Sequence, residues 1–412
     1  MNHLDKNDHL NNEFAIFTVC NLAYLPKALV LSESVNKYQN QRLKVFLFDK
    51  KTDTDFSQFG IEVFWIEDLD IPNFNQLAFK YDIIEFSTCL KPFITISLLE
   101  KYDKVIFLDP DTCLFNTVAP ILDDLDKHSI VLTPHYTTPQ SNDLSESDTG
   151  MLRFGSFNLG FYAVRRSDES LYFLNWWSQR CLDLCYMDSQ FGLSTDQKWV
   201  TIAPCFFKDL YVSFNLGYNF AAWNSWERKL SKDLDGNYLV NEDVPLTFFH
   251  FSNFDKNDPE YLNKRSCYET NIRRPDLLEI GTWYSNALDS KNTNMATVKY
   301  AYDYMSNGQY ISPTLRRAYA CILAELPVDH DPFDSDGIVA KFAKKNFLFE
   351  TNNAIYKREG FGAVSSNKGK LNLIYFLMRI VLRIVGPNKF MNLSRLMVYL
   401  SSYRLNRDLW KY

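Results

Sequence analysis

Two aspartates, Asp109 and Asp111, stand one residue apart at the end of an apolar run. The run, Val105 to Leu108, consists of strand-forming residues and predicts a strand buried on both faces of a parallel sheet. Pro110 cannot continue the ladder of a strand, so we expect a turn there. Open α/β sheets bind ligands at the carboxyl ends of their strands, where two carboxylates can share a divalent cation that grips a diphosphate. An Asx turn that uses two aspartates is the simpler alternative.

The stretches around this strand alternate between strand and helix patterns at short intervals, which predicts an α/β sandwich with a mainly parallel sheet. The predicted strands are Phe14 to Cys20, Lys44 to Phe48, Glu62 to Ile66, Ser129 to Thr133, Ser156 to Val164, Tyr211 to Phe214 and Leu246 to Phe251. Helical patterns follow the first strand and cover Ile83 to Lys101 and Asp168 to Leu184. Past about Arg273 the patterns are helical, and Ser312-Pro313 is a strong start signal for a helix.

The charge of the chain is unevenly distributed. With 412 residues the chain is long enough for one large domain and an appendage, and its net charge is −6. Residues 367–412 contain nine Lys or Arg and a single Asp, so this tail carries about +8 and the remainder about −14. A basic end on an acidic protein indicates an anionic partner surface. Because no nucleic-acid-binding module accompanies it, we expect no nucleic-acid partner.

Two amphipathic stretches lie in this tail. Leu371 to Val385 is mostly apolar but contains Arg379 and Arg383 and ends at Gly386-Pro387, so it is too short and too charged to span a bilayer. Lys389 to Trp410 has the same mixed character. Basic side chains beside large apolar ones suit a helix that lies on an anionic membrane surface. A helical bundle packed on the rest of the protein is the alternative.

The cysteines and the N-terminus predict the compartment. Eight cysteines are scattered without CxxC pairs or zinc-like spacing, which is typical of a chain in a reducing cytoplasm. Met1 to Glu13 is polar and lacks the apolar core of a secretory signal. We therefore expect a cytoplasmic protein that makes peripheral contact with the inner face of a membrane.

The aspartate pair belongs to a series of four motifs that follow one another along the chain. They are Asp103-Lys-Val-Ile-Phe-Leu-Asp-Pro-Asp111, Phe157-Asn-Leu-Gly160, Asp196-Gln197 and His250-Phe-Ser-Asn-Phe-Asp-Lys256. Over about residues 14–256 their order and spacing resemble those of the GT-A glycosyltransferases, and among them the family-eight group that includes glycogenin and bacterial lipopolysaccharide galactosyltransferases. Asn253 stands where that group has glycine and Asn257-Asp258 where it has Pro-Trp, which implies a relative with a different path in this loop.

The resemblance implies a division of the chain and a set of ligands. Residues 1–272 would form a GT-A catalytic domain with its acceptor side from about residue 150, followed by a helical extension at 273–366 and the basic tail at 367–412. Asp109, Asp111 and His250 would bind Mn²⁺ or Mg²⁺. Lys91, Pro110 and Lys256 would contact the nucleotide-sugar donor beside the metal.

Further roles follow from the same resemblance. Asn158, Asp196 and Gln197 would orient the donor sugar and, with Lys91, form the catalytic set. The residues implied for the base and ribose are Thr18, Cys20, Asn21, Tyr24 and Asp49. Tyr218, Trp223 and Asn224 would face the acceptor, with a position in the core as an equal alternative for Trp223.

The resemblance implies a metal-dependent, hexosyltransferase-like enzyme that moves a sugar from a UDP-sugar to a glycan, such as a lipid-linked bacterial surface polysaccharide, with retention of configuration. A protein that binds nucleotide sugars or glycans without catalysis is the alternative from another class. A sugar-nucleotide pyrophosphorylase would need a glycine-rich loop after the first strand to hold a triphosphate. Cys20 to Pro26 contains no glycine, which argues against that activity.

Overall fold

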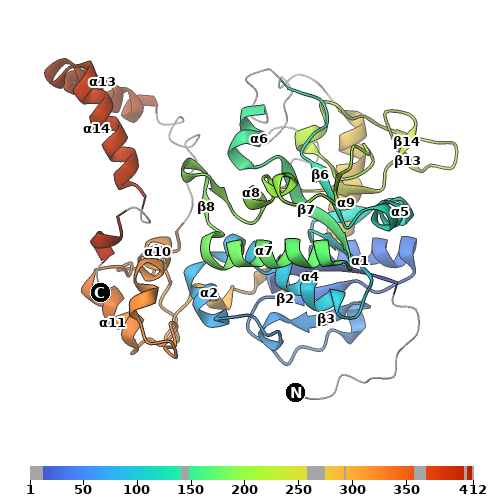
Figure 1. Cartoon of the computed structure of the whole chain (residues 1–412), viewed down its shortest axis with the longest axis horizontal. Helices are drawn as coiled ribbons and strands as arrows, with labels where there is room; N and C mark the ends of the chain where they lie inside the picture. The colour runs from blue at the N-terminus through green and yellow to red at the C-terminus, as the bar shows by residue number, and fades with distance from the viewer. Residues whose placement is uncertain are drawn as a thin grey trace. The chain divides into compact units, whose positions relative to one another are not determined.

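The computed structural model of the whole chain describes residues 13–140, 148–257, 274–291, 294–356, 368–402 and 406–410 (Figure 1). The chain divides into two compact units, Met1–Pro72 with Ile83–Ala301, and Asn73–Asp82 with Tyr302–Tyr412. This division differs from the predicted boundary at residue 272. Helix α9 (Pro275–Ser290) belongs to the first unit because Tyr284 stacks on Phe251, with 3.8 Å between ring centroids.

A seven-stranded sheet forms the centre of the first unit, in the order β10-β6-β7-β4-β1-β2-β3. The strands are β1 (Phe14–Cys20), β2 (Lys44–Leu47), β3 (Glu62–Trp65), β4 (Lys104–Leu108), β6 (Ile130–Pro134), β7 (Phe157–Arg165) and β10 (Leu210–Val212). Neighbours run parallel except at β7, which is antiparallel to both β4 and β6. The predicted α/β fold with a largely parallel sheet is confirmed.

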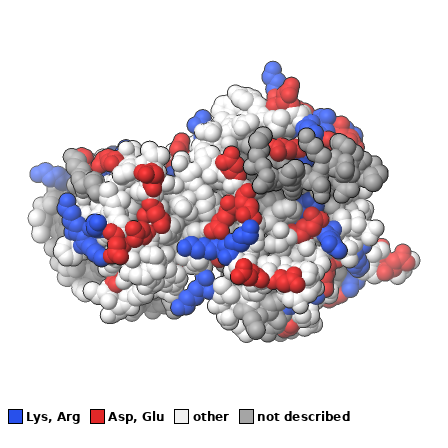
Figure 2. All heavy atoms as spheres, turned by 90° about the horizontal axis from the view of Figure 1, so that it is seen from below, with Lys and Arg blue, Asp and Glu red and all other residues white. Residues whose placement is uncertain are grey.

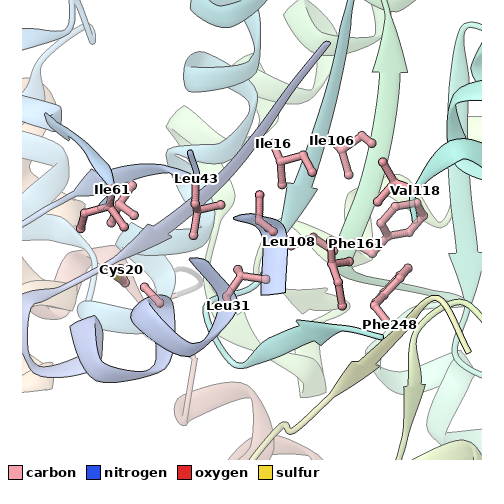
Figure 3. Close-up of a cluster of buried hydrophobic side chains, with 14 of the residues drawn as sticks. Ile16, Cys20, Leu31, Leu43, Ile61, Ile106, Leu108, Val118, Phe161 and Phe248 are labelled. Carbon is pink, nitrogen blue, oxygen red and sulfur yellow. The ribbon is translucent and has the colours of Figure 1, made fainter. Parts of the chain in front are cut away.

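Both faces of the sheet are covered by apolar side chains, which explains the uninterrupted apolar run of β4. On one face Ile106 and Leu108 pack in a buried cluster with Leu31 (Figure 3). That cluster joins the sheet to α1 (Leu25–Gln39) and α5 (Ala119–Lys127). On the other face Phe107 stacks on Tyr162, which packs edge-on against Trp177 of α7 (Asp168–Leu184). Full burial of each such side chain contributes about 1.5–3 kcal/mol, so the end of β4 is rigidly held.

A small three-stranded sheet continues from the end of β4. Its order is β11-β15-β5, with β5 (Thr112–Leu114) directly after the aspartate pair, β11 (Phe220–Ala221) and β15 (Phe248–His250). Strand β15 runs antiparallel to β5 and its register pairs His250 with Thr112. This pairing brings the histidine beside Asp111, although the two are far apart in sequence.

The remaining elements of the first unit are short. The helices are α3 (Ile83–Cys89), α4 (Lys91–Leu99), α6 (Asp148–Phe154) and α8 (Gln197–Val200), and the strands are β8 (Met187–Asp188), β9 (Leu193–Ser194), β12 (Leu230–Lys232), β13 (Tyr238–Val240) and β14 (Val244–Pro245). Figure 2 shows one face of the molecule, on which the described basic and acidic side chains lie among one another.

The second unit is helical. It contains α2 (Phe74–Lys80), α10 (Pro313–Ile322), α11 (Ile338–Lys345), α13 (Lys368–Val385) and α14 (Pro387–Leu400). Ser312 caps α10 as its sequence predicts, because its hydroxyl accepts from the backbone N–H of Leu315 at 3.1 Å. The buried Arg316 joins α10 to α2 by donating to the carbonyls of Ala78 and Phe79.

Helices α13 and α14 expose most of their apolar side chains. Leu373, Phe376 and Ile384 are 59%, 58% and 77% exposed. The two helices meet at Gly386, whose φ of 80° interrupts the helix before Pro387. Within the described residues, no helix combines the length and apolarity needed to cross a membrane.

Candidate metal centre and active site

The turn after β4 is held from three sides by the main chain. The backbone N–H and hydroxyl of Thr112 donate to the Asp109 carbonyl at 3.0 and 2.8 Å. The Asp109 N–H donates to Gly160 O at 2.8 Å, and the Phe251 N–H donates to Asp111 O at 2.7 Å. These bonds end on main-chain carbonyls and leave the two carboxylates available, which disfavours the Asx-turn alternative.

Asp109, Asp111 and His250 form one cluster in which the potential ligand atoms lie within 4.8 Å of one another. His250 Nε2 is 3.2 Å from Asp111 Oδ1 and 3.8 Å from Asp109 Oδ2. Burial opposes ionisation of Asp111, but His250 and Lys27 outweigh it and lower the pKa of this carboxyl to about 2. Two carboxylates and an imidazole fit Mn²⁺, and with less preference Mg²⁺.

Gly160 makes room for the histidine. A Cβ at this position would lie 2.3 Å from His250 Cε1, which no side chain can tolerate without displacing the ring. The glycine of the Phe157-Asn-Leu-Gly160 motif is therefore a packing requirement of the metal cluster. Sequence alone linked the motif to the donor sugar.

A buried ammonium joins the cluster to Asp196. Lys91 Nζ donates to Leu159 O at 2.9 Å and lies 3.5 Å from Asp109 Oδ1 and 3.4 Å from Asp196 Oδ2. Burial acts to lower the pKa of Lys91, but the two carboxylates outweigh it and raise the pKa. Burial also raises the pKa of the Asp196 carboxyl to about 7, against the opposing effect of Lys91. Lys91 thus stabilises the carboxylates on both sides of it.

Asn158 and Gln197 are partly engaged by the protein itself. Asn158 Oδ1 accepts from the Gly160 N–H at 3.0 Å, and within the described residues its Nδ2 has no recorded partner. Gln197 Nε2 donates to Phe154 O at 3.1 Å, and its Oε1 accepts from the Leu159 N–H at 3.3 Å. Gln197 therefore ties α8 to β7, while Asn158 offers a donor. The roles in sugar orientation stay predictions.

The residues predicted for the base and ribose divide into two groups. Thr18 and Cys20 are buried in β1, at 0% and 2% exposed, so neither presents its side chain at the surface. Burial, assisted by Asp49, also raises the pKa of the Cys20 thiol. Asp49 Oδ2 accepts from the Leu22 N–H at 2.5 Å and so fixes the loop after β1.

The second group borders the start of α1. Asn21 Oδ1 accepts from the Tyr24 N–H at 3.2 Å, which caps a turn, and Tyr24 is 47% exposed and free to meet a flat ligand. Lys27, which sequence reasoning missed, lies 4.3 Å from the Tyr24 ring centroid, and its Nζ is 3.8 Å from Asp111 Oδ2. Its position one turn after the predicted tyrosine could have suggested it.

Lys256 is not brought to the cluster. Its ammonium pairs with Asp289 on an exposed surface, and within the described residues it has no recorded contact with the aspartate pair. Asn253 of the same motif has φ 56°, a left-handed conformation that asparagine tolerates almost as glycine does. That explains how asparagine can stand in the glycine position. Asp258 lies outside the described residues.

The three residues predicted to face the acceptor are all buried, and for Trp223 this agrees with the alternative of a core position. Tyr218, Trp223 and Asn224 are 1%, 3% and 0% exposed. Trp223 Nε1 and Asn224 Nδ2 both donate to His135 O, at 2.9 and 3.0 Å. Trp223 and Asn224 thus complete buried hydrogen bonds, whereas Tyr218 packs in the hydrophobic core against Phe248.

No family model matches the chain. Two proteins of Bacillus subtilis (strain 168) are similar to part of it. The uncharacterized protein YfnD is 31% identical over 175 residues, which cover 41% of this chain and 54% of YfnD. The uncharacterized protein YfnF is 25% identical over 187 residues, which cover 44% of this chain and 61% of YfnF. The chain thus spans less than two thirds of the length of either relative.

Two solved structures are similar over a larger share of the chain. The galactosyltransferase LgtC, in complex with donor and acceptor sugar analogues, is 14% identical, with 68% of this chain and 96% of LgtC covered and a TM-score of 0.42. The glycosyltransferase GlyE of Streptococcus pneumoniae TIGR4 is 17% identical, with 72% and 67% covered and a TM-score of 0.41. Both neighbours are glycosyltransferases by name. At such scores the likeness carries no functional argument, which has to come from the side chains.

Proposed function

We propose that this chain is a metal-dependent glycosyltransferase that moves a sugar from a nucleotide-diphosphate sugar, a UDP-sugar by its resemblance to family eight, to a glycan acceptor. The observation that carries the proposal is the cluster of Asp109, Asp111 and His250 at the carboxyl end of β4, with the buried pair of Lys91 and Asp196 beside it. Charged groups are costly to bury, and a cluster of them in one place is typical of a site that handles a charged substrate.

The three ligands would hold Mn²⁺ or Mg²⁺, with the imidazole favouring Mn²⁺. The chemistry that a bound ion supplies there is Lewis-acid stabilisation of the charge on a leaving diphosphate. Asn158 and Asp196 would hold the donor sugar in position for attack. In the retaining transfer that the resemblance implies, the bond from the anomeric carbon to the diphosphate breaks and a bond to the acceptor oxygen forms on the same face. The acceptor proton passes to the departing phosphate.

Lys27 is our candidate for the cation that meets the diphosphate. Its ammonium lies between the exposed Tyr24 ring, which offers a stacking surface for the base, and the Asp111 carboxylate. A diphosphate that joins a base on Tyr24 to a metal on Asp111 must pass this ammonium. Lys27 also lies in the first turn of α1, where the helix end favours an anion. Lys256 would need to leave Asp289 before it could serve the same purpose.

The exposed helices α13 and α14 support a membrane location for the acceptor. Their apolar side chains lie beside Arg379, Arg383, Lys389 and Arg395, the composition of a helix at an anionic lipid surface. We therefore propose that the protein works at the inner face of a membrane on a lipid-linked glycan. After α14 the chain contacts α10 of the same unit, where Arg407 donates a hydrogen bond to the main-chain carbonyl of Cys321 at 2.9 Å.

A panel of nucleotide sugars with Mn²⁺ tests the proposal, with released nucleoside diphosphate as the measured product. We expect slow hydrolysis of one donor in the absence of acceptor, and loss of at least about 10²-fold of this activity in Asp111→Asn, which removes a metal ligand at constant size. Asp126→Asn, an exposed change in a surface ion pair with Lys104, is the matched control. Tight binding of UDP with no turnover of any donor would favour the non-catalytic binding protein.

A further inference from the structure

His250 presents its two ring nitrogens to different partners. Nε2 faces the carboxylates of Asp109 and Asp111, whereas Nδ1 lies 3.1 Å from Oδ1 of Asn219. A neutral imidazole carries its proton on only one nitrogen, and only the other can bind a metal. The state of His250 therefore depends on what Asn219 offers to Nδ1.

The hydrogen-bond network fixes which end of the Asn219 amide faces the histidine. The Gly160 N–H is a backbone donor, so the atom of Asn158 that it contacts at 3.0 Å must be the oxygen. That oxygen also lies 3.1 Å from the far end of the Asn219 amide, which must then be the NH₂ group. The opposite end, toward His250, is consequently the carbonyl oxygen, which can only accept.

Thr133 Oγ1 lies 3.1 Å from Asn219 Nδ2 and serves as a second acceptor for this NH₂ group. Asn219 itself is held firmly in place. Asn219 is 1% exposed, and its φ of 51° is one that asparagine tolerates. Its main-chain carbonyl oxygen accepts from Asn224 Nδ2 at 2.9 Å. The ring of Trp223 packs edge-on against His250, with 5.1 Å between centroids. The imidazole is thus confined on two sides.

We propose that Asn219 is a positioning residue that keeps the proton of His250 on Nδ1, so that the Nε2 lone pair faces the two carboxylates. Through its NH₂ group the same side chain holds Asn158, which links the orientation of the metal ligand to that of the residue nearest the donor sugar. The inference rests on the proposed function. The inference extends the proposed function because one amide, that of Asn219, contacts both the proposed metal ligand His250 and Asn158, which is proposed to orient the sugar.

The direct test reads the protonation of His250 in the full chain without metal. Labelling the six histidines with ¹⁵N and assigning His250 by comparison with His250→Gln allows its ring nitrogens to be identified by NMR. We expect Nδ1 to carry the proton in the wild type. An Nδ1 that carries no proton in the folded protein would overturn the proposal, whether or not Nε2 is also protonated against the two carboxylates and whether or not any sugar nucleotide is turned over.

Binding of Mn²⁺ alone, measured by electron paramagnetic resonance, provides the second readout. Asn219→Ala should weaken Mn²⁺ binding by about 10- to 100-fold, the usual effect of removing a partner of a metal ligand. Asn219→Asp retains an acceptor for His250 but loses the donors to Asn158 and Thr133. It should bind Mn²⁺ within about threefold of the wild type and show an altered KM for the donor.

Thr133→Val is the matched control, because it removes a partner of Asn219 Nδ2 without touching the contact with His250. Wild-type Mn²⁺ affinity in a folded Asn219→Ala variant would overturn the proposal. If Asn219→Ala fails to fold, the test passes to Asn219→Asp, which keeps the acceptor for His250. Weak Mn²⁺ binding by a folded Asn219→Asp variant would then overturn the proposal. Failure of the wild-type protein to bind Mn²⁺ would contradict the proposed function, while the NMR result still decides the proton position.

Discussion

The cluster of Asp109, Asp111 and His250 in the first unit and helices α13 and α14 in the second unit differ in chemical character. Around Asp109 and Asp111, charged and polar side chains are buried and paired with one another. Along α13 and α14, large apolar side chains are exposed to solvent. Each arrangement is unfavourable for an isolated protein, since buried charge and exposed apolar surface both cost free energy. Under the proposed function the two regions would meet two different ligands, a small charged one and an extended apolar one.

The two regions also differ in how they are held. Asp109, His250 and Asn219 are fixed by neighbouring strands and by hydrogen bonds to buried groups. A site built in this way is arranged before its ligand arrives, which is what catalysis of a charge-separating reaction requires. Helices α13 and α14 gain little from packing, so a surface that covers their apolar residues would add stability to them.

The most severe test of the metal side is Gly160→Ala. Because the new Cβ would lie 2.3 Å from His250 Cε1, the imidazole must leave its place. We expect Mn²⁺ binding to be lost and donor turnover to fall by about 10³-fold, the equivalent of several kcal/mol of lost charge stabilisation. Calorimetry with Mn²⁺ and a donor hydrolysis assay measure the two effects.

The double variant Gly160→Ala with His250→Ala provides the control for this prediction. If the clash with the ring is the cause, removing the ring should recover most of the unfolding free energy lost in Gly160→Ala, while Mn²⁺ binding stays absent. A single Gly160→Ala variant that retains Mn²⁺ binding would contradict the packing argument.

The membrane side of the comparison is tested by Leu373→Ser, Phe376→Ser and Leu377→Ser together. These exposed residues lie at helical spacing on one face of α13. If each contributes about 1 kcal/mol when partly inserted in lipid, binding to vesicles with anionic lipid should fall by about 10²-fold in a sedimentation assay. Donor hydrolysis should be unchanged, because these residues belong to the second unit and the aspartate pair and His250 to the first.

The control replaces exposed apolar residues of the first unit, with Tyr172→Ser and Leu234→Ser in one variant. It should sediment with vesicles as the wild type does. If the triple variant instead unfolds, or binds vesicles unchanged, α13 packs against protein and the helical-bundle alternative is favoured.

The sequence predicted those features that depend on local patterns. The apolar run before Asp109 indicated a doubly covered strand, and Pro110 indicated its end, because both follow from backbone chemistry that acts over a few residues. The Ser312 cap was correctly predicted for the same reason. The resemblance named His250, and the antiparallel register of β15 with β5 explains how it reaches Asp111.

Features that depend on packing between distant segments could not be read in this way. The burial of Trp223 and Asn224 arises from their shared acceptor, His135 O, which no sequence pattern reveals. Asn219 and Lys27 were missed because a single polar residue in a loop or at a helix start is common. Only the contacts with His250 and Asp111 single them out.

A pair of lysine variants tests the donor side of the metal cluster. Lys27→Gln should weaken Mn²⁺-dependent UDP binding by about tenfold, because a hydrogen bond to a charged phosphate contributes about 1.5–3 kcal/mol. Binding of Mn²⁺ alone should change much less. Lys256→Gln is the matched comparison and should have a smaller effect, since this lysine pairs with Asp289. Isothermal titration with UDP measures both, and the reverse order would return the phosphate role to Lys256.

The smallest expected effect concerns the proton of Asp196. Burial raises the pKa of this carboxyl from 3.8 to about 7 in the folded protein, whereas in the unfolded chain it stays near its ordinary value. The folded state then holds the proton more tightly, so the contribution of Asp196 to stability is lost as the pH rises from about 4 to about 7. Asp196→Asn cannot ionise and should lack this loss. Its thermal midpoint relative to that of the wild type should rise by about 2–4 °C between pH 5 and pH 8.

Exposed Asp103→Asn should instead follow the pH profile of the wild type, since its carboxylate lies at the surface. The pH dependence of Asp196→Asn relative to the wild type shows whether Asp196 changes charge in the folded protein. A different slope in Asp196→Asn means that Asp196 changes from neutral to charged beside Lys91 as the pH rises, so that the charge near the cluster changes close to neutrality. Equal slopes would mean that Asp196 is ionised throughout this range because Lys91 fully compensates its burial. The net charge beside the cluster would then not change with pH.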